Sequence, residues 1–263
     1  MSSRAWNAEA LVLSVLPFSD DHRTVMLLVP QEHGSVIQPA TLFGGARSKL
    51  KGMVTPYQTG RIWLYSNPIK NSHKITDFSV TAYRMELRES LIRSWCAAVC
   101  SEVTLKTCGT VDWQLANAFL DGLCVSDDAG CERGLLRFLW RLIWTAGIAP
   151  DIFHCNMCGC KLPITRFTTG VDTKGIAEQA NRSIYSSTED ACFCEICRSA
   201  DAYTFPLSVE ALGYLHAVTE KPPGYSRHLP LSPAAYGELN RFLFFLTEKM
   251  IGSKLKTFQV GYV

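Results

Sequence analysis

The sequence predicts an α+β protein in which a small five-stranded barrel precedes an all-helical domain with an inserted four-cysteine module. Short Val- and Leu-rich segments separated by turn residues fill the first 75 or so residues. From about residue 80 onward, apolar residues recur at helical spacing instead. Two Cys-x-x-Cys pairs then lie close together in the second half of the chain. At 263 residues, 47% of them apolar, the chain can form two or three packed modules.

Five strand-like segments predict the barrel. They are Ala8–Phe18, Thr24–Val29, Ser35–Ala40, Met53–Tyr65 and Ile69–Ile75, and polar or glycine-containing turns separate them. Pro56 and Gly60 are expected at a bulge or an edge. Five short strands in such a span favour a small closed barrel.

Five later segments predict helices. They are Met85–Val103, Trp113–Leu123, Gly134–Gly147, Phe205–Val218 and Leu231–Gly252, and the last two each carry a serine ahead of an acidic residue near the N-terminus. We therefore expect four regions: residues 1–79 as the barrel, 80–150 as the first helical part, 151–200 as the cysteine module and 201–263 as the second helical part.

The amino-acid composition limits the classes of protein to which this chain can belong. The net charge is only +2, although residues 1–80 hold eight Lys or Arg against five Asp or Glu. No apolar run reaches the roughly 18 residues that span a bilayer, and the N-terminus resembles no signal peptide. We expect a soluble, unsecreted, cytoplasmic protein. Eleven cysteines without an export signal favour reduced thiols and a metal site over disulfides.

The cysteine module carries the clearest chemical signal. Cys155 with Cys158, and Cys194 with Cys197, have the spacing that lets each pair reach one tetrahedral zinc ion. The 35 residues between the pairs exceed the usual 15 to 20, so free thiols and a redox dithiol remain alternatives. Cys160, Cys192 and His154 could each replace one ligand.

Catalytic use of this zinc is not expected. The module lacks the H-x-E and P-C-x-x-C of deaminases and the H-E-x-x-H of metalloproteases. Four thiolates would close the coordination shell, so the site should be structural and should order the polar insert 161–190. A Walker A segment is also absent, so nucleotide hydrolysis is not expected.

Four stretches together resemble the bacterial recombination mediator RecO family. EALVLSVLPFSDDHRTVMLLVPQEHG (9–34) resembles its first two strands, and GGARSKLKG (44–52) its basic loop. LLRFLWRLIWTAGIAPDIFHCNMCG (135–159) resembles its leucine-rich helix, G-x-x-P break and first cysteine pair, and GSKLKTF (252–258) its terminal basic signature. The resemblance covers nearly the whole chain in order.

The resemblance implies an N-terminal OB-fold, a helical domain and a zinc module with four cysteine ligands. It also implies a non-catalytic mediator in DNA repair and recombination. Such a protein binds single- and double-stranded DNA, anneals complementary strands, contacts the acidic tail of single-stranded-DNA-binding protein, and acts with RecR to load RecA.

A barrel of this kind binds single strands through a basic groove and aromatic stacking platforms. The candidate phosphate contacts are Arg23, Arg47, Lys49, Lys51, Arg61, Lys70 and Lys74, and the candidate stacking residues are Tyr57, Trp63 and Tyr65. Trp63 is expected in the core of its strand instead, and Arg23 could pair with Asp20 or Asp21.

Arg133, Arg137 and Arg141 recur every four residues and so share one helical stripe beside apolar positions. We expect this stripe either to receive the acidic, Phe-ending tail of single-stranded-DNA-binding protein or to be the solvated edge of an amphipathic helix. Two further functional classes remain open. One is a zinc-stabilised scaffold that binds only proteins, and the other is an enzyme with a catalytic zinc or cysteine.

Overall fold

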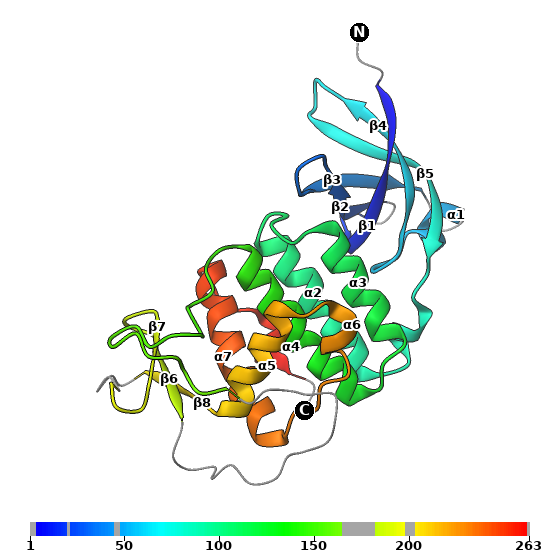
Figure 1. The fold of residues 1–263 in the computed structure, drawn as a ribbon. Helices are drawn as coiled ribbons and strands as arrows, with labels where there is room; N and C mark the ends of the chain where they lie inside the picture. The colour runs from blue at the N-terminus through cyan, green and yellow to red at the C-terminus, as the bar shows by residue number, and fades with distance from the viewer. Residues whose placement is uncertain (1–3, 20–21, 45–47, 165–181, 198–202, 262–263) are drawn as a thin grey trace. The chain divides into compact units, whose positions relative to one another are not determined.

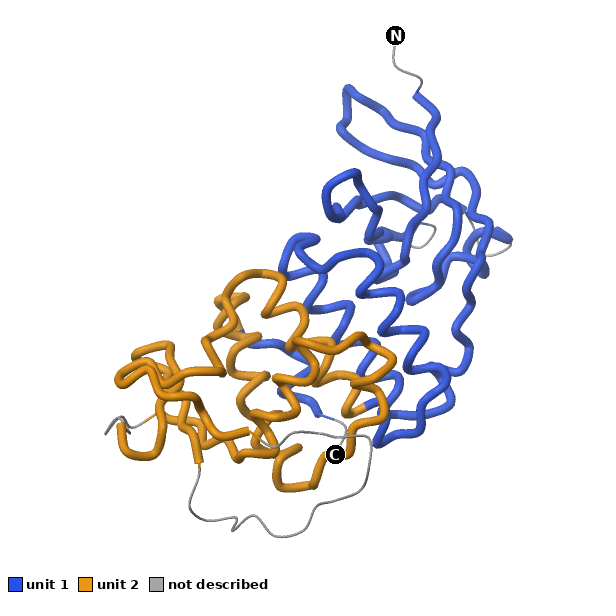
Figure 2. Tube along the Cα trace, in the orientation of Figure 1, with its two compact units in different colours: residues 1–131, 254–263 blue, residues 132–253 orange. Residues whose placement is uncertain are grey.

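The computed structural model describes residues 4–19, 22–44, 48–164, 182–197 and 203–261 (Figure 1). The chain divides into two compact units (Figure 2). Residues 1–131 and 254–263 form the first unit, and residues 132–253 form the second. The finer division into four regions stays a prediction.

Five strands of the first unit close into a barrel in the order β1-β2-β3-β5-β4, which confirms the predicted five-stranded barrel. They are β1 (Ala5–Pro17), β2 (His22–Pro30), β3 (Ser35–Phe43), β4 (Thr59–Asn67) and β5 (Ser72–Ala82). Strand β4 pairs antiparallel with both β1 and β5, and one parallel pairing, Thr41 with Lys74, joins β3 to β5. Closure leaves no long free edge in the sheet.

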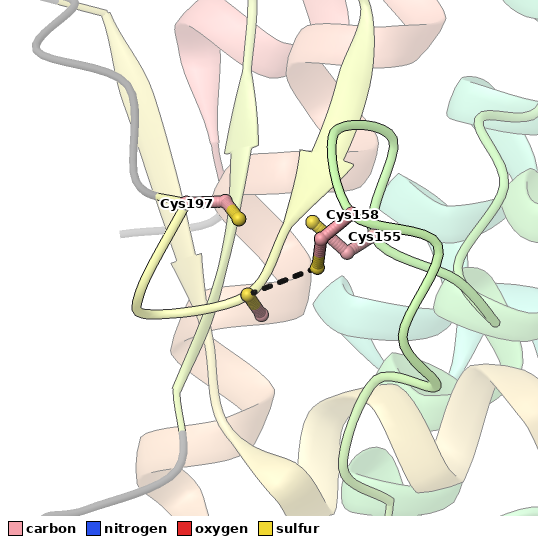
Figure 3. A group of neighbouring side chains, drawn as sticks. Cys155, Cys158 and Cys197 are labelled. Atoms are coloured by element: carbon pink, nitrogen blue, oxygen red, sulfur yellow. Dashed lines mark hydrogen bonds between the residues drawn. The ribbon is translucent and has the colours of Figure 1, made fainter.

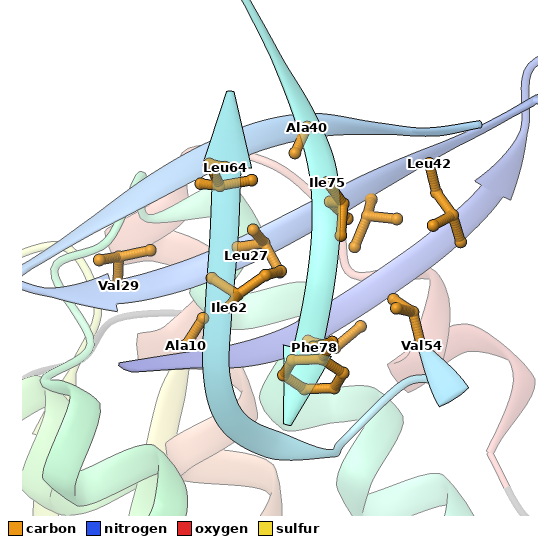
Figure 4. Packing of buried hydrophobic residues seen from close by; sticks show 12 residues of the cluster. Ala10, Leu27, Val29, Ala40, Leu42, Val54, Ile62, Leu64, Ile75 and Phe78 are labelled. Carbon is orange, nitrogen blue, oxygen red and sulfur yellow. The ribbon is translucent and has the colours of Figure 1, made fainter. Parts of the chain in front are cut away.

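Alternate residues of every strand fill the barrel interior (Figure 4). Val12, Leu27, Ile62, Leu64 and Phe78 are each at most 1% exposed in this cluster. Strands place successive side chains on opposite faces, so the apolar alternation in the sequence gives this core directly. The barrel is therefore a packed body whose binding surface must lie on its outside.

Two expectations about β4 need correction. Trp63 is not a core residue, because Ile62 and Leu64 point inward and the alternation turns Trp63 to the outer face, where it is half-buried. The strand also begins at Thr59 rather than at residue 53, because a turn at residues 56–57 precedes it, with Tyr57 at φ 72°. Gly60 does lie at a register shift, where a Cβ would meet the Ser79 carbonyl at 2.1 Å.

The first unit also contains helices. They are α1 (Lys49–Met53), the 3-10 helix η1 (Met85–Arg88), α2 (Leu91–Lys106), α3 (Trp113–Cys124) and α8 (Lys256–Val260). Asp112 caps α3 by accepting from the amides of Gln114 and Leu115. Glu102 of α2 does the same for α8, because its carboxylate accepts from the Lys256 and Thr257 amides, each at 2.9 Å.

Arg84 joins the barrel to α3 inside the first unit. Its guanidinium donates to the Tyr57 carbonyl at 2.6 Å, to Thr59 Oγ1 and Asn117 Oδ1 at 2.8 Å each, and to Asp121 at 2.7 Å. The side chain is 4% exposed, so these bonds satisfy a buried charge. The arginine has a positive φ of 50°, which aims it back at the barrel.

The second unit combines helices with a small sheet. Helix α4 (Asp128–Thr145) runs into it from the first unit, and β6 (Ser183–Ser186), β7 (Ala191–Phe193), β8 (Thr204–Leu207), α5 (Val209–Glu220), α6 (Pro223–Ser226) and α7 (Pro233–Ile251) follow. Ser208 and Ser232 cap α5 and α7, as predicted. Among the described residues, no helix is long and apolar enough to span a bilayer.

The sheet has the order β7-β6-β8, and all four residues of β6 are buried. Tyr185 of β6 packs its ring against Phe242 of α7, with centroids 5.0 Å apart. Its hydroxyl donates to Asp190, which also accepts from Lys249 of α7 at 2.9 Å. The sheet that carries the second cysteine pair is thereby fixed to α7.

Candidate functional site

Four cysteine sulfurs gather at the end of this sheet (Figure 3). Those of Cys155, Cys158, Cys194 and Cys197 all lie within 4.8 Å of one another, and Cys158 and Cys194 are 3.9 Å apart. A tetrahedral zinc ion with sulfurs at 2.3 Å requires sulfur-to-sulfur distances of about 3.8 Å. The spacing of the four atoms therefore fits one tetrahedral metal ion.

The first cysteine pair is held by a tight hairpin. The Cys155 amide donates to the Cys160 carbonyl at 2.8 Å, and the Gly159 amide donates to the Cys155 carbonyl at 2.9 Å. Gly159 has φ 70°, a left-handed conformation that suits glycine. The turn aims both sulfurs of the pair to the same side.

Backbone amides favour the thiolate forms of Cys155 and Cys194, which are the forms that bind a metal cation. Burial opposes ionisation of Cys155, but amide hydrogen bonds from Cys158, Cys194 and Met157 outweigh it and lower its pKa to about 6. An amide bond from Cys197 is the largest cause that lowers the pKa of Cys194. Such donors surround metal-bound thiolates as an outer shell, so the residues present fit a thiolate-bound metal.

The three alternative ligands do not belong to this group of four. Cys192 is buried in β7, and burial raises the pKa of its thiol to about 12, which disfavours the thiolate that a metal needs. The His154 imidazole contacts Asp151 at 3.2 Å instead. Cys160 is exposed, and contacts with Cys158 and Cys194 raise the pKa of Cys160 and of Cys197 alike to about 12, so the spacing of the sulfurs, rather than the pKa, separates Cys160 from the group of four. The sequence missed one supporting contact, in which the Asn156 amide donates to the Cys192 carbonyl at 2.9 Å and ties the two pairs together.

The candidate phosphate contacts spread over the barrel surface. Arg47 lies outside the described residues. Arg61 is exposed but pairs with Glu9 at 3.1 Å, which neutralises it. The remaining candidates, Arg23, Lys49, Lys51, Lys70 and Lys74, form no ion pair within the described part of the chain. Lys49 and Lys51 share the short helix α1, and Lys70 and Lys74 lie on the β4–β5 hairpin.

The three candidate stacking residues differ in accessibility. Tyr65 is 39% exposed on the outer face. Tyr57 is half-buried, burial raises the pKa of its hydroxyl, and its carbonyl is bound by Arg84. Trp63 is half-buried on the outer face. Tyr65 is therefore the best placed of the three to meet a ligand.

Comparison with known protein families shows which family the chain belongs to. A family model described as "Recombination protein O C terminal" matches residues 113–258, from the start of α3 into α8. The chain belongs to the RecO family. No curated protein matches it. The matched RecO region contains both cysteine pairs and the arginine stripe, while the barrel precedes it.

Within the RecO region, the arginine stripe of α4 is largely buried. Arg137 donates to the Tyr214 hydroxyl at 2.9 Å and is 8% exposed, and half-buried Arg141 donates to Ser226 Oγ at 3.0 Å. Arg133 is also half-buried. No carboxylate of the described residues pairs with the three. Burial, followed by the neighbouring Arg137 charge, lowers the pKa of Arg141.

Proposed function

We propose that this RecO-family protein is a non-catalytic mediator of DNA repair and recombination. It binds single- and double-stranded DNA, anneals complementary strands, and helps RecR to load RecA onto DNA coated with single-stranded-DNA-binding protein. The observation that carries this proposal is the closed barrel with several cations that form no ion pair with the described residues, in a chain that belongs to the RecO family. Unpaired cations attract phosphates because a bound nucleic acid releases its counterions. The protein acts in the cytoplasm.

We also propose that the four-cysteine site binds one structural zinc ion. Cys155, Cys158, Cys194 and Cys197 would hold it, and the fit of their spacing and amide donors supports this. A zinc bound by four thiolates has no open position for substrate, which agrees with a non-catalytic role.

The arginine stripe supports a partner site. Buried Arg137 and half-buried Arg141 carry positive charge without a carboxylate partner among the described residues. Carboxylates of an acidic peptide would supply the missing charge through charge-assisted hydrogen bonds. We assign the acidic tail of single-stranded-DNA-binding protein to this stripe.

Annealing of complementary oligonucleotides without ATP tests the main proposal. We expect the wild-type protein to accelerate annealing and a Lys49→Ala/Lys51→Ala variant to lose most of that acceleration. The matched control is Lys221→Ala/Arg227→Ala, which removes two exposed cations from the second unit. A wild-type protein that neither binds nor anneals DNA would support the second candidate, a zinc-stabilised protein scaffold, which the net charge of only +2 favours.

A further inference from the structure

A row of side chains crosses the outer surface of the barrel strand by strand. The Phe18 amide donates to the His22 carbonyl at 2.9 Å, so these residues are opposite at the β1–β2 turn. His22 opposes Phe43 in the β2–β3 register, and Lys74 opposes Tyr65 in the β4–β5 register. We call Phe18, His22, Phe43, Lys74 and Tyr65 the aromatic row.

The aromatic row faces outward and is accessible. Its neighbours along the strands, Leu42, Leu64 and Ile75, point into the core, so the row occupies the opposite face. Phe18 is 73% exposed, and Phe43 and Tyr65 are 40% and 39% exposed. Exposed aromatic rings that follow one line across a small barrel mark a binding surface.

Lys74 and Arg4 contact two of the aromatic rings of the row. Lys74 Nζ lies 5.0 Å from the centre of the Phe43 ring, and the His22 and Phe43 rings are 4.5 Å apart at an angle of 62°. At the far end, Arg4 donates to the Tyr65 hydroxyl at 3.3 Å. Cation–π contacts and ring packing fix the orientation of the rings before any ligand arrives.

We propose that the aromatic row is the track on which the unpaired bases of a single-stranded nucleic acid stack. The inference rests on the proposed function and adds which form of nucleic acid the barrel selects. Phe43 and Tyr65 lie on strands separated by β5, about 10 Å apart by the strand spacing, with Lys74 between them. A base that stacks on Phe43 takes the place of Lys74 over the ring, and the freed ammonium binds a phosphate while a second base stacks on Tyr65. Every base has a face to offer, so the track accepts any sequence.

The composition of the row favours nucleic acid over a protein partner. Three aromatic rings alternate with a histidine and a lysine, and no acidic residue occupies these five positions. A duplex hides the faces of its bases, so it gains nothing from the rings. The row therefore discriminates single strands from duplexes, whereas the phosphate contacts of α1 do not.

Three labelled probes test the inference by fluorescence anisotropy: an oligothymidylate, an abasic strand of the same length, and a duplex. Replacing Phe43 by leucine keeps the apolar side chain and removes the ring. We expect the Phe43→Leu variant to bind oligothymidylate at least about fivefold more weakly, and to bind the abasic strand and the duplex as the wild type does. Phe43→Trp should restore binding of oligothymidylate.

The control is Tyr83→Leu, which removes an exposed ring that lies outside the row, and it should bind all three probes normally. Tyr65→Leu provides a second test if Phe43→Leu does not fold, as judged by thermal unfolding. Undiminished binding of oligothymidylate by the folded row variants, or an equal loss for the abasic strand, would overturn the inference. A wild-type protein that binds none of the probes would overturn the proposed function instead.

Discussion

The individual sulfur atoms of the four-cysteine site have unequal surroundings. Cys155 is 2% exposed and receives three amide hydrogen bonds, whereas Cys158 is exposed on the facing side of the cluster. A thiol whose thiolate form is favoured by amide hydrogen bonds costs little to deprotonate when a metal binds. The amide hydrogen bonds of Cys155 therefore favour metal binding at this position.

We predict that the purified protein contains one zinc ion per chain and that a Cys155→Ser/Cys194→Ser variant contains none. Elemental analysis measures this. Removing the zinc with a chelator should lower the melting temperature of the wild type, because a metal that binds only the folded state stabilises it by mass action. Cys160→Ser is the control, and its zinc content should equal that of the wild type. A loss of zinc in that variant would instead make Cys160 a ligand.

Glu102 predicts a pH dependence of stability. Burial raises the pKa of its carboxyl, but hydrogen bonds from the Thr257 and Lys256 amides outweigh burial and lower it below the ordinary 4.5. A carboxyl whose pKa is lower in the folded state stabilises the protein above its unfolded pKa, and this contribution disappears as the pH falls through the folded pKa.

We therefore expect Glu102→Gln to lower the melting temperature at neutral pH, and the difference from wild type to shrink as the pH drops below about 4.5. Thermal unfolding followed by circular dichroism measures both. Glu86→Gln, at an exposed position of η1, should show no comparable pH-dependent difference. A difference that stays constant with pH would show that the Glu102 charge does not stabilise α8.

At the level of elements, the sequence predicted those with a local signal. Val- and Leu-rich segments between turn residues placed the five strands, and helical spacing placed the long helices. The short strands β6, β7 and β8 were not predicted, and residues 205–207 of β8 were assigned to a helix. These strands have three or four residues each, and their sheet is held by contacts such as Tyr185 with Phe242. Tertiary packing, rather than local propensity, determines such strands.

The features of the candidate site also divide into those that local sequence predicts and those that depend on residues far apart in the chain. The Cys-x-x-Cys spacing predicted the four sulfurs that the fold brings together, because two cysteine ligands of one metal ion can be recognised from their short separation in the sequence. The bonds of Arg84 and the neutralisation of Arg61 by Glu9 depend on residues far away in the chain. Of the aromatic row, the sequence analysis named Lys74 and Tyr65 but not Phe18, His22 and Phe43, because strand register alone brings the five residues into line.

Helix α4 supports a prediction about peptide binding. We expect a fluorescent acidic peptide that ends in phenylalanine to bind the wild type, and Arg141→Ala to weaken binding about tenfold or more, since hydrogen bonds between charged groups are the strong ones. Arg141 is preferable to Arg137, whose burial makes its removal destabilising.

Lys221→Ala, which removes an exposed cation of the same unit, is the control and should bind the peptide normally. A folded Arg141→Ala variant that binds the peptide as the wild type does would mean that the stripe only packs α4 against α5 and α6. The docking site would then be sought near Arg241 and Lys249 of α7.

For the whole molecule, a net charge of +2 means that attraction to DNA must come from local clusters of cations. Each phosphate neutralised on a single strand contributes about −0.7 to the slope of log affinity against log salt. We predict that Lys49→Ala/Lys51→Ala flattens this slope by about 1.4, measured by anisotropy titrations at several salt concentrations. An unchanged slope would place the phosphate contacts elsewhere on the barrel.

The return of α8 to the first unit has a consequence for synthesis on the ribosome. Trp95 Nε1 donates to the Thr257 carbonyl and Glu102 accepts from the amides of Lys256 and Thr257, so α2 completes its contacts only with residues that are made about 150 residues later. The roughly 120 residues of the second unit are made in between, which takes about 6 to 24 s at the usual rates. The first unit is therefore begun before the second unit and completed after it, and α2 remains without its α8 contacts while the second unit is made.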